Sequence, residues 1–531
     1  MKRRHILPLL LWTLAWFLFF LPLFTGAERL PNSDFSGQFH AFGLFQAREV
    51  NAGHLPVWSP GSYAGFPFAA DPQSAVFYPL RWLTILLSLP WSFTYQALQL
   101  AILETFAWLP LVLLLLRLGV RRERPLPYLL AAGATLGVSA LAGHPQTFLH
   151  ASYLAAAYFL FLVGQARWSW RWQLGLGAAI AATAVGVALA SWLPAWHYLA
   201  LTTRSETGYE FVSKGFPLLD YWQLLVPGPF SLWTPQYVGV TAVLLTLIAW
   251  WGRQQGRRAE IFFWFGAAFL AAWLSLGDKG ILFELVYHIA PGFSLFRQQE
   301  RLVNIVSLSL ALLAAQGLAI WLQAAAPQRR DWLRRTAIVL GLGLILAGVV
   351  LAGMRAAAPS DWPMIWLRQG VVTAVALTLL WQIKQRRWLG LSLTLLLGVD
   401  LTLAVLPTLN FQPQGTADFW QQPDWLAAIQ TTEPARIDSG RLFHANVGEA
   451  YGLEDIGGIS PLKPQVLDVL EALPRERLWQ LLNVQYILSD QPLDEVDQLK
   501  QIATIDDSLL PGETAASIRQ IPSCYIRRCL I

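Results

Sequence analysis

The sequence is poor in cysteine and in charged residues. Its 531 residues include only two cysteines, Cys524 and Cys529, which excludes a disulfide scaffold and a cysteine-rich metal site. Charged residues make up 13% of the chain, whereas a soluble domain carries roughly 25%. This deficit excludes a conventional water-soluble enzyme and a disordered chain. Walker A loops, GxSxG nucleophile elbows and HExxH zinc motifs are also absent from the sequence.

Hydrophobic residues, by contrast, make up 55% of the chain, and they occur in blocks of about 20, the length that crosses roughly 30 Å of hydrocarbon. The blocks predict an all-α polytopic membrane protein with about eleven transmembrane helices. The net charge of +5 does not indicate a nucleic-acid partner, because the basic residues lie between the apolar blocks. The expected spans lie near residues 6–25, 93–118, 126–142, 147–164, 173–193, 236–252, 260–276, 302–323, 336–354, 370–383 and 388–408.

The basic residues also favour one orientation. If the N-terminus is cytoplasmic, six short inner segments hold 19 of the 38 lysines and arginines, and the longer outer loops hold fewer. This distribution follows the positive-inside rule and predicts a multi-pass protein of the plasma membrane with a cytoplasmic N-terminus. Since the number of spans is odd, the C-terminal tail is expected outside the cytoplasm.

Three outer segments, residues 26–92, 194–235 and 277–301, are too long to be plain connections. The first contains a predicted helix over 35–50 and an apolar piece at 79–90 that is too short to span. That piece is expected to lie along the interface or to re-enter the membrane. Because all three segments are on one side, the working face is predicted to be external.

The composition changes after Thr408 and becomes polar and rich in proline. We therefore expect a transmembrane domain over residues 1–408 and a small soluble α/β domain over 409–531, outside the membrane. Within this domain the sequence predicts a helix around 463–472 and a strand over 484–488.

The candidate catalytic residue is Asp34, about nine residues after the first span. A carboxylate at the membrane surface can deprotonate a hydroxyl acceptor as a general base. Asp34 can equally be the N-cap of the helix over 35–50, and the two roles are compatible. Gln38 and His40, in the following turns, are either polar ligands for a sugar or interfacial residues.

The rest of the first loop mixes aromatic rings, prolines and a few polar groups, as expected of a rigid sugar-binding wall. Anchoring at the membrane interface would use the same aromatic residues. A short turn between two later spans adds a second polar pair, which either lines the same cavity or is a plain proline turn. The candidate sugar ligands are His54, Trp58, Asp71 and Gln73 in the loop, and His144 and Gln146 in the turn.

Arg297 and Arg301 run directly into a span and are four residues apart, so both are predicted to point to one face of a helix. A guanidinium pair is well suited to bind a phosphate or pyrophosphate. A structural ion pair with Glu300 is the competing explanation. Glu104 and Asp400 lie within spans, where carboxylates are costly; each is either functional or a satisfied group between helices.

The sequence resembles the YfhO-like bacterial membrane proteins of the GT-C glycosyltransferase superfamily. The resemblance rests on five blocks, each of which is weak alone. They are Asp34 with Gln38; Leu55 to Trp58, Gly65 to Phe68, Asp71 to Ser74 and Phe77 to Pro79; Gly143 to Gln146; Phe296-Arg297 with Glu300-Arg301; and Tyr451-Gly452 with Leu482 to Leu488. Gln298-Gln299 departs from the proline-containing segment expected after Phe296-Arg297.

The resemblance implies a GT-C-like core, interfacial helices in the first outer loop, and a polyprenyl-phosphate-linked sugar as donor. Asp34 would then be the catalytic base, and Arg297 and Arg301 would hold the donor phosphate. The acceptor would be an extracytoplasmic polymer or glycan of the cell envelope. No cofactor is firmly implied, although Asp34 and Asp71 could share a divalent cation. A transporter or flippase of a lipid-linked intermediate and a noncatalytic envelope-assembly scaffold are the alternatives.

Overall fold

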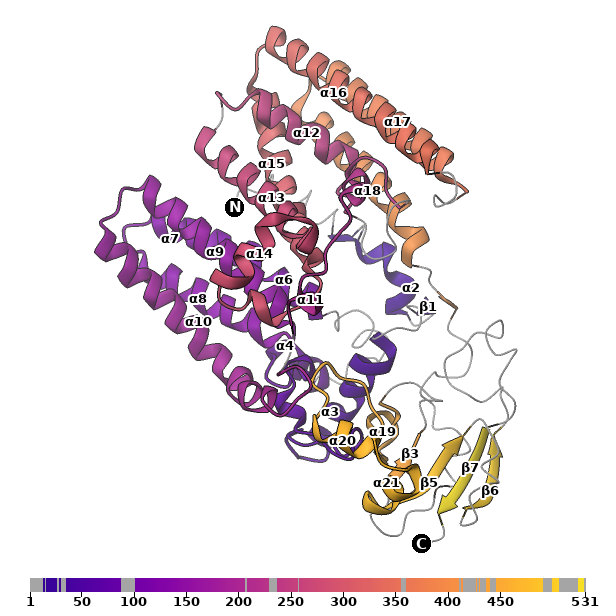
Figure 1. Cartoon of the computed structure of the whole chain (residues 1–531). Helices are drawn as coiled ribbons and strands as arrows, with labels where there is room; N and C mark the ends of the chain where they lie inside the picture. The colour runs from indigo at the N-terminus through magenta and orange to yellow at the C-terminus, as the bar shows by residue number, and fades with distance from the viewer. Residues whose placement is uncertain are drawn as a thin grey trace. The chain divides into compact units, whose positions relative to one another are not determined.

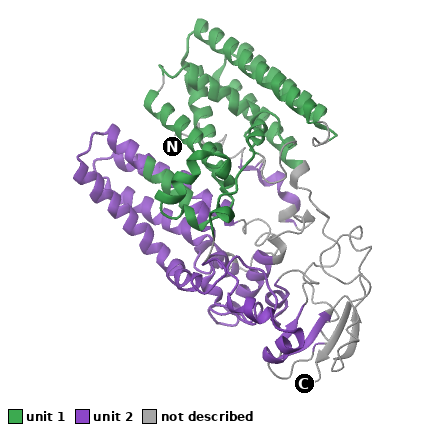
Figure 2. Ribbon diagram, viewed as in Figure 1, with its two compact units in different colours: residues 1–12, 149–157, 207–410 green, residues 13–148, 158–206, 411–531 purple. Residues whose placement is uncertain are grey.

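The chain is mostly helical and forms two compact units (Figures 1 and 2). Unit 1 comprises residues 1–12, 149–157 and 207–410, and unit 2 comprises 13–148, 158–206 and 411–531. The computed structural model describes residues 13–14, 16–25, 28–29, 35–86, 101–205, 208–228, 236–255, 257–354, 360–409, 412–413, 426, 429, 436–439, 446–489, 499–505 and 524–529.

In unit 2, glycines allow two helices to pack closely. A Cβ atom at Gly133 of α8 would lie 2.5 Å from the Ile180 carbonyl oxygen, and one at Gly137 would lie 2.7 Å from that of Ala184, both on α10. Small residues at such contacts are typical of helices that pack within a membrane. The helices of the unit are α2 (Leu21–Phe24), η2 (Phe35–His40), α3 (Ala41–Asn51), η3 (Phe68–Ala70), η4 (Pro72–Ser74), α4 (Pro79–Leu86), α6 (Ala101–Ala107), α7 (Leu109–Arg121), α8 (Leu126–Leu141), α10 (Trp170–Leu199), α19 (Val447–Tyr451), α20 (Val466–Glu471) and α21 (Arg475–Leu481), while α9 (Pro145–Gln165) is shared between the units.

Unit 1 is built in the same way around α12 and α15. A Cβ atom at Gly317 of α15 would lie 1.9 Å from the Leu245 carbonyl oxygen of α12, so only glycine permits this approach. The helices of the unit are α11 (Tyr209–Val212), η5 (Leu218–Leu224), α12 (Val240–Trp251), α13 (Arg258–Leu274), η6 (Gly277–Lys279), α14 (Ile281–Ile289), η7 (Phe293–Leu295), η8 (Gln299–Leu302), α15 (Val303–Gln323), α16 (Ala326–Gly353), α17 (Trp362–Gln382) and α18 (Arg386–Leu409).

Seven helical segments of the described chain are long and apolar enough to cross a membrane, and α8 and α12 are shorter apolar helices. This confirms a helical membrane protein, while the number of eleven spans stays a prediction. The first predicted span, 6–25, lies partly outside the described residues. The seven segments are Ala101–Arg121, Pro145–Gln165, Trp170–Leu199, Gln299–Gln323, Ala326–Gly353, Trp362–Gln382 and Arg386–Leu406.

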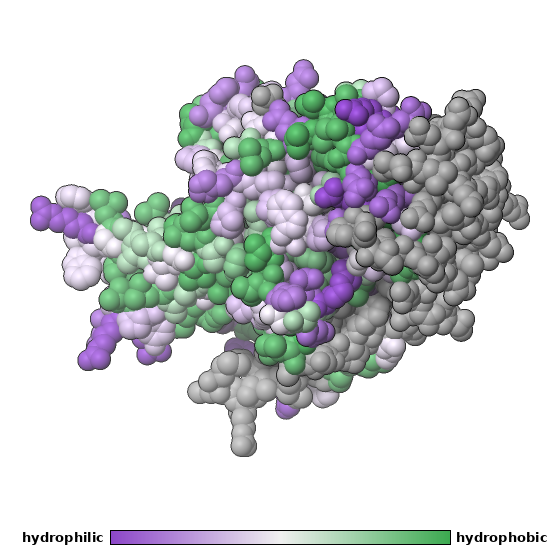
Figure 3. Space-filling model, turned by 90° about the horizontal axis from the view of Figure 1, so that it is seen from below, coloured by the Kyte–Doolittle hydropathy of each residue, from purple (hydrophilic) through white to green (hydrophobic). Residues whose placement is uncertain are grey.

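The helical surface is apolar, as lipid contact requires. On α16 the exposed side chains include Leu342, Ile345 and Val349. The space-filling view shows hydrophobic side chains over much of the helical surface that it displays (Figure 3). In water such exposed faces would be unfavourable, so the pattern agrees with a lipid environment.

The tail contains a mixed five-stranded sheet in the order β4-β3-β5-β7-β6. Strand β3 pairs in parallel with β4 and β5, and β7 pairs antiparallel with β5 and β6. The predicted strand is present as β5 and the predicted helix as α20, so the small α/β character of the tail is confirmed. The strands are β3 (Arg436–Asp438), β4 (Glu454–Asp455), β5 (Val484–Ser489), β6 (Leu499–Ile505) and β7 (Cys524–Cys529); a separate pair joins β1 (Glu28–Arg29) to β2 (Gln412–Pro413).

Candidate functional site

The first loop, residues 35–86 as described, folds around its own aromatic core. The ring of Phe68 lies 5.0 Å from that of Phe42 and 4.8 Å from that of Phe45, both from α3. Phe66 joins this core, and Leu467 of the tail closes it. These buried rings form a core and not an exposed sugar-binding wall, whereas Trp58 and Phe77 of the same loop are 57% and 37% exposed.

The tail docks on this loop through two glycines. A Cβ atom at Gly448 of α19 would lie 2.0 Å from the Gly61 carbonyl oxygen, and one at Gly61 would lie 2.5 Å from the Glu449 nitrogen. Arg48 of α3 donates to the carbonyl oxygen of Glu449 over 2.9 Å. We call this contact between residues 35–86 and 446–471 the loop–tail contact.

Glu449 is fully buried at the centre of the loop–tail contact. Ser62 donates to its Oε2 over 2.5 Å and Ser59 donates to its Oε1 over 3.1 Å. Burial raises the pKa of this carboxyl to about 7, although both hydroxyls act in the opposite direction. Sequence reasoning missed Glu449, whose one local signal is an acidic residue two positions before Tyr451-Gly452.

Asp71 is also buried and is engaged on both oxygens. Its Oδ1 accepts from the Gln73 backbone N–H at 2.8 Å, and its Oδ2 accepts from the Ser460 hydroxyl at 2.6 Å. Burial raises its pKa. These contacts cap η4 and attach the tail, so in this structure Asp71 stabilises the fold.

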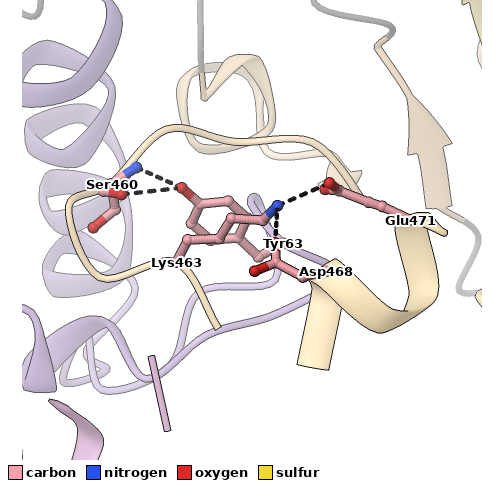
Figure 4. A network of polar contacts seen from close by, with 5 residues as sticks. All are labelled: Tyr63, Ser460, Lys463, Asp468 and Glu471. Atoms are coloured by element: carbon pink, nitrogen blue, oxygen red, sulfur yellow. Dashed lines mark hydrogen bonds and ion pairs between the residues drawn. The ribbon is translucent and has the colours of Figure 1, made fainter. Parts of the chain in front are cut away.

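Tyr63 strengthens the same junction, as Figure 4 shows. Its hydroxyl oxygen accepts from the Ser460 backbone N–H at 2.5 Å. Beside it, Lys463 forms ion pairs of 2.8 Å with both Asp468 and Glu471, and these pairs are partly exposed. A structural role for this segment follows.

Three of the predicted sugar ligands lie near one another in unit 2. Gln38 donates to the side-chain oxygen of Gln73 over 2.7 Å. Gly143 lies against the same turn, because a Cβ atom there would be 2.9 Å from the Pro72 carbonyl oxygen. His144 follows directly; its Nδ1 accepts from the Thr147 backbone N–H at 3.1 Å and caps α9.

The remaining predicted ligands of unit 2 differ in exposure. Gln146 is buried at the start of α9. His54 is exposed, with its Nδ1 3.6 Å from the Glu49 carboxylate. Asp34, the candidate base, lies outside the described residues; along the chain it directly precedes η2, which carries Gln38. The structure therefore joins Gln38, Gln73 and the turn at 143–146, and leaves His54 apart from them on the surface.

In unit 1, parts of the second and third loops form one structure. Asp278 donates its backbone N–H to the Ser213 carbonyl oxygen over 2.7 Å, and Gln299 donates to that of Lys214 over 2.9 Å. A Cβ atom at Gly277 would lie only 2.0 Å from the Ser213 oxygen. We call residues 208–228 with 275–302 the paired loops.

The two candidate phosphate ligands lie in the paired loops, but not on one helical face as predicted. That prediction is wrong because Gln298 adopts a left-handed conformation (φ 63°), which ends any helix between the arginines. Arg297 lies over the ring of Phe211, 5.3 Å from its centroid, and Arg301 donates to the Gln298 side-chain oxygen over 2.6 Å. Glu300 interacts electrostatically with Arg301 and with Lys279. A proline could not take this φ, so the left-handed turn at position 298 requires another residue there.

Of the two acidic residues in spans, Asp400 is a satisfied structural group. It is fully buried and accepts from the Tyr237 hydroxyl, from Gln369 and from the Val240 backbone N–H. The last contact caps α12. Glu104 differs, since its Oε2 is buried and has no hydrogen-bond partner among the described residues.

The described residues contain no group of three or more His, Cys, Asp or Glu side chains that could hold a metal ion. No protein-family model matches the chain, and no curated protein matches it either. The site is therefore argued from its own residues. Amides at Gln38 and Gln73 offer donors and acceptors for hydroxyl groups, and the arginines of the paired loops offer positive charge for an anion.

Proposed function

We propose that the chain is a YfhO-like, GT-C type membrane glycosyltransferase. It would transfer a sugar from a polyprenyl-phosphate-linked donor to an extracytoplasmic acceptor, a polymer or glycan of the cell envelope. The number of spans, near eleven, the plasma-membrane location and the outward orientation of the tail belong to the same proposal.

One observation carries the proposal. Sequence blocks that are far apart along the chain and that carry the family resemblance come together in unit 2: Gln38 bonds to Gln73, and Gly143 lies against Pro72. If the chain shares the fold of that family, the blocks that carry the resemblance are expected to lie together in space. The resemblance itself remains an analogy for chemistry.

In the proposed step, the carboxylate of Asp34 takes the proton of the acceptor hydroxyl, and the oxygen of that hydroxyl attacks the anomeric carbon of the donor sugar. The bond from that carbon to the phosphate oxygen breaks, and the lipid phosphate leaves with the electron pair. Arg297 and Arg301 stabilise its developing charge. Attack on the face opposite the leaving group inverts the anomeric configuration.

The test is turnover of polyprenyl-phosphate sugars by the purified chain in proteoliposomes, supplied with an envelope fraction as acceptor. Asp34→Asn is expected to lower turnover by a factor of about 100 or more, the usual contribution of a general base. Glu49→Gln, which changes a partly exposed acid of the same loop, is the matched control and is expected to retain turnover. Near-normal turnover by Asp34→Asn contradicts the assignment.

The same assay separates the alternatives. Passage of the intact lipid-linked sugar across the bilayer without transfer would identify a transporter or flippase. Unchanged envelope assembly in cells carrying Asp34, Arg297 and Arg301 substitutions would identify a scaffold.

A further inference from the structure

The helix α14 exposes an apolar stripe although it is too short to span a membrane. Ile281, Leu285 and Ile289 follow one another at four-residue spacing and are 87%, 55% and 67% exposed. The opposite side is anchored, since Phe283 is fully buried. Residues at this spacing share one face of a helix, so the stripe is continuous.

One flank of the same helix is polar. Glu284 and His288 are exposed beside the stripe. A helix that exposes an apolar sector next to a charged flank is typical of segments that lie in the plane of a membrane interface.

The position of α14 along the chain indicates its depth relative to the membrane. It begins seven residues after α13 ends, and Gly280 lies against the ring of Trp273 in the last turn of α13, where a Cβ atom would be 3.0 Å from the indole. Tyr221 of η5 donates to the Ala272 carbonyl oxygen in the same turn over 2.7 Å. This is the end of α13 remote from Arg257 and Arg258. Trp and Tyr side chains at the end of an apolar helix mark the level of the lipid headgroups.

We propose that α14 is an in-plane membrane helix whose stripe of Ile281, Leu285 and Ile289 is inserted into the lipid of one leaflet. The occupant of the exposed face is lipid, because Gly280, directly before α14, lies against Trp273 in the last turn of α13, and α14 is followed by α15, which belongs to a candidate span.

The inference goes beyond the proposed function and holds whatever reaction the protein performs. It also explains how the paired loops are held at the membrane. The rings of Phe283 and Tyr287 lie 6.2 Å and 5.0 Å from that of Tyr209 in α11, and Phe211 of α11 lies under Arg297. Lipid insertion of α14 would thus set Arg297 near the headgroup phosphates. Only this position of Arg297 connects the inference to the proposed function.

The experiment uses the full chain in liposomes of phosphatidylcholine and phosphatidylglycerol. Cys524→Ser and Cys529→Ser provide a background for a nitroxide spin label at Leu285→Cys or, separately, at Ile281→Cys. Collision with oxygen, which concentrates in lipid, and with a water-soluble nickel chelate is measured for each label. Ile345→Cys on α16 is the lipid reference and Asp468→Cys on α20 is the water reference.

The expected oxygen-to-nickel collision ratio at residues 281 and 285 is severalfold above that at Asp468→Cys and near that at Ile345→Cys. A label at Glu284→Cys, on the polar flank, should give a clearly lower ratio. Ratios at 281 and 285 that equal the water reference would overturn the proposal. Low collision with both reagents would overturn it too, since it would mean that protein covers the stripe. These readouts need no turnover, so they fail or succeed independently of the glycosyltransferase assignment.

Discussion

Glu449 and Asp71 are buried in the loop–tail contact, whereas Lys214, Asp278 and Arg297 of the paired loops lie at the surface. Glu449 and Asp71 are closed off from water, with hydroxyl and backbone partners from both sides of the loop–tail contact. In the paired loops, Lys214 and Asp278 form a partly exposed ion pair, 3.5 Å apart, and Arg297 lies over a ring. The polar groups of the first region hold the fold together, whereas the second region carries charged side chains at the surface.

This difference predicts that the loop–tail contact stabilises the fold and that the paired loops bind a ligand. A buried carboxylate costs desolvation energy and is tolerated where it joins segments that must stay together. The exposed guanidinium of Arg297 lies over an aromatic ring, which attracts its positive charge. We therefore expect substitutions in the loop–tail contact to change stability, and substitutions of the arginines to change ligand binding.

The largest expected effect comes from the aromatic core of the loop. Phe66→Ala should lower the free energy of unfolding by about 3–5 kcal/mol, because the fully buried ring leaves a cavity. Trp58→Ala, a larger truncation in the same loop, should cost only about 1 kcal/mol, since that side chain is mostly exposed. Thermal unfolding in detergent, followed by proteolysis of the loop, measures both. Equal losses of unfolding free energy in the two variants would contradict the assignment of Phe66 to the core and of Trp58 to the surface.

A smaller loss is expected when the two backbones of the loop–tail contact are forced apart. Gly448→Ala places a Cβ atom 2.0 Å from the Gly61 oxygen, so the tail must shift, at a cost of about 2–3 kcal/mol. The tail should then be cleaved by trypsin faster than in the parent chain. Gly175→Ala is the matched control, because nothing lies within 4 Å of its added Cβ. A tail equally protected in both variants would count against this contact.

The last effect, the smallest for a change of one pH unit, is a dependence of stability on pH. The pKa of Glu449 is about 7 in the folded chain and near 4.5 when unfolded. Its contribution to the free energy of unfolding is therefore complete below pH 4.5 and is lost as the pH rises to about 7. Over that window stability should fall by about 1 kcal/mol per pH unit from this group. Asp455, with a pKa of about 6, and Asp71 act in the same direction.

Glu449→Gln should flatten that slope, whereas Glu454→Gln, a partly exposed neighbour, should leave it unchanged. The measurement is the unfolding temperature in detergent between pH 4.5 and 7.5. A slope that Glu449→Gln does not change would show that this carboxyl is not the titrating group.

Local features of this fold were predictable from the sequence. The apolar blocks coincide with helices because backbone groups in lipid must bond within their own segment. The helix over 35–50 and the strand over 484–488 also follow from local pattern, as η2 with α3 and as β5.

Contacts between distant segments were not predictable. Nothing local pairs Gly61 with Gly448, or assigns Ser460 as the partner of Asp71. The spacing of Arg297 and Arg301 suggested a shared helical face, but a left-handed residue between them gives a different geometry. Local periodicity carries no information on such a turn or on which remote chain segment satisfies a buried carboxylate.

The central claim is that a lipid-linked phosphate binds at the arginines while the loop–tail contact remains structural. Native mass spectrometry of the chain purified in mild detergent tests it directly. We predict a co-purified polyprenyl phosphate or phosphate-linked sugar that is retained by Glu449→Gln and by Asp34→Asn, and lost when Arg297 and Arg301 are both replaced by Ala. An isoprenoid lipid that stays bound in the double variant, or its absence from the parent chain, would contradict the account.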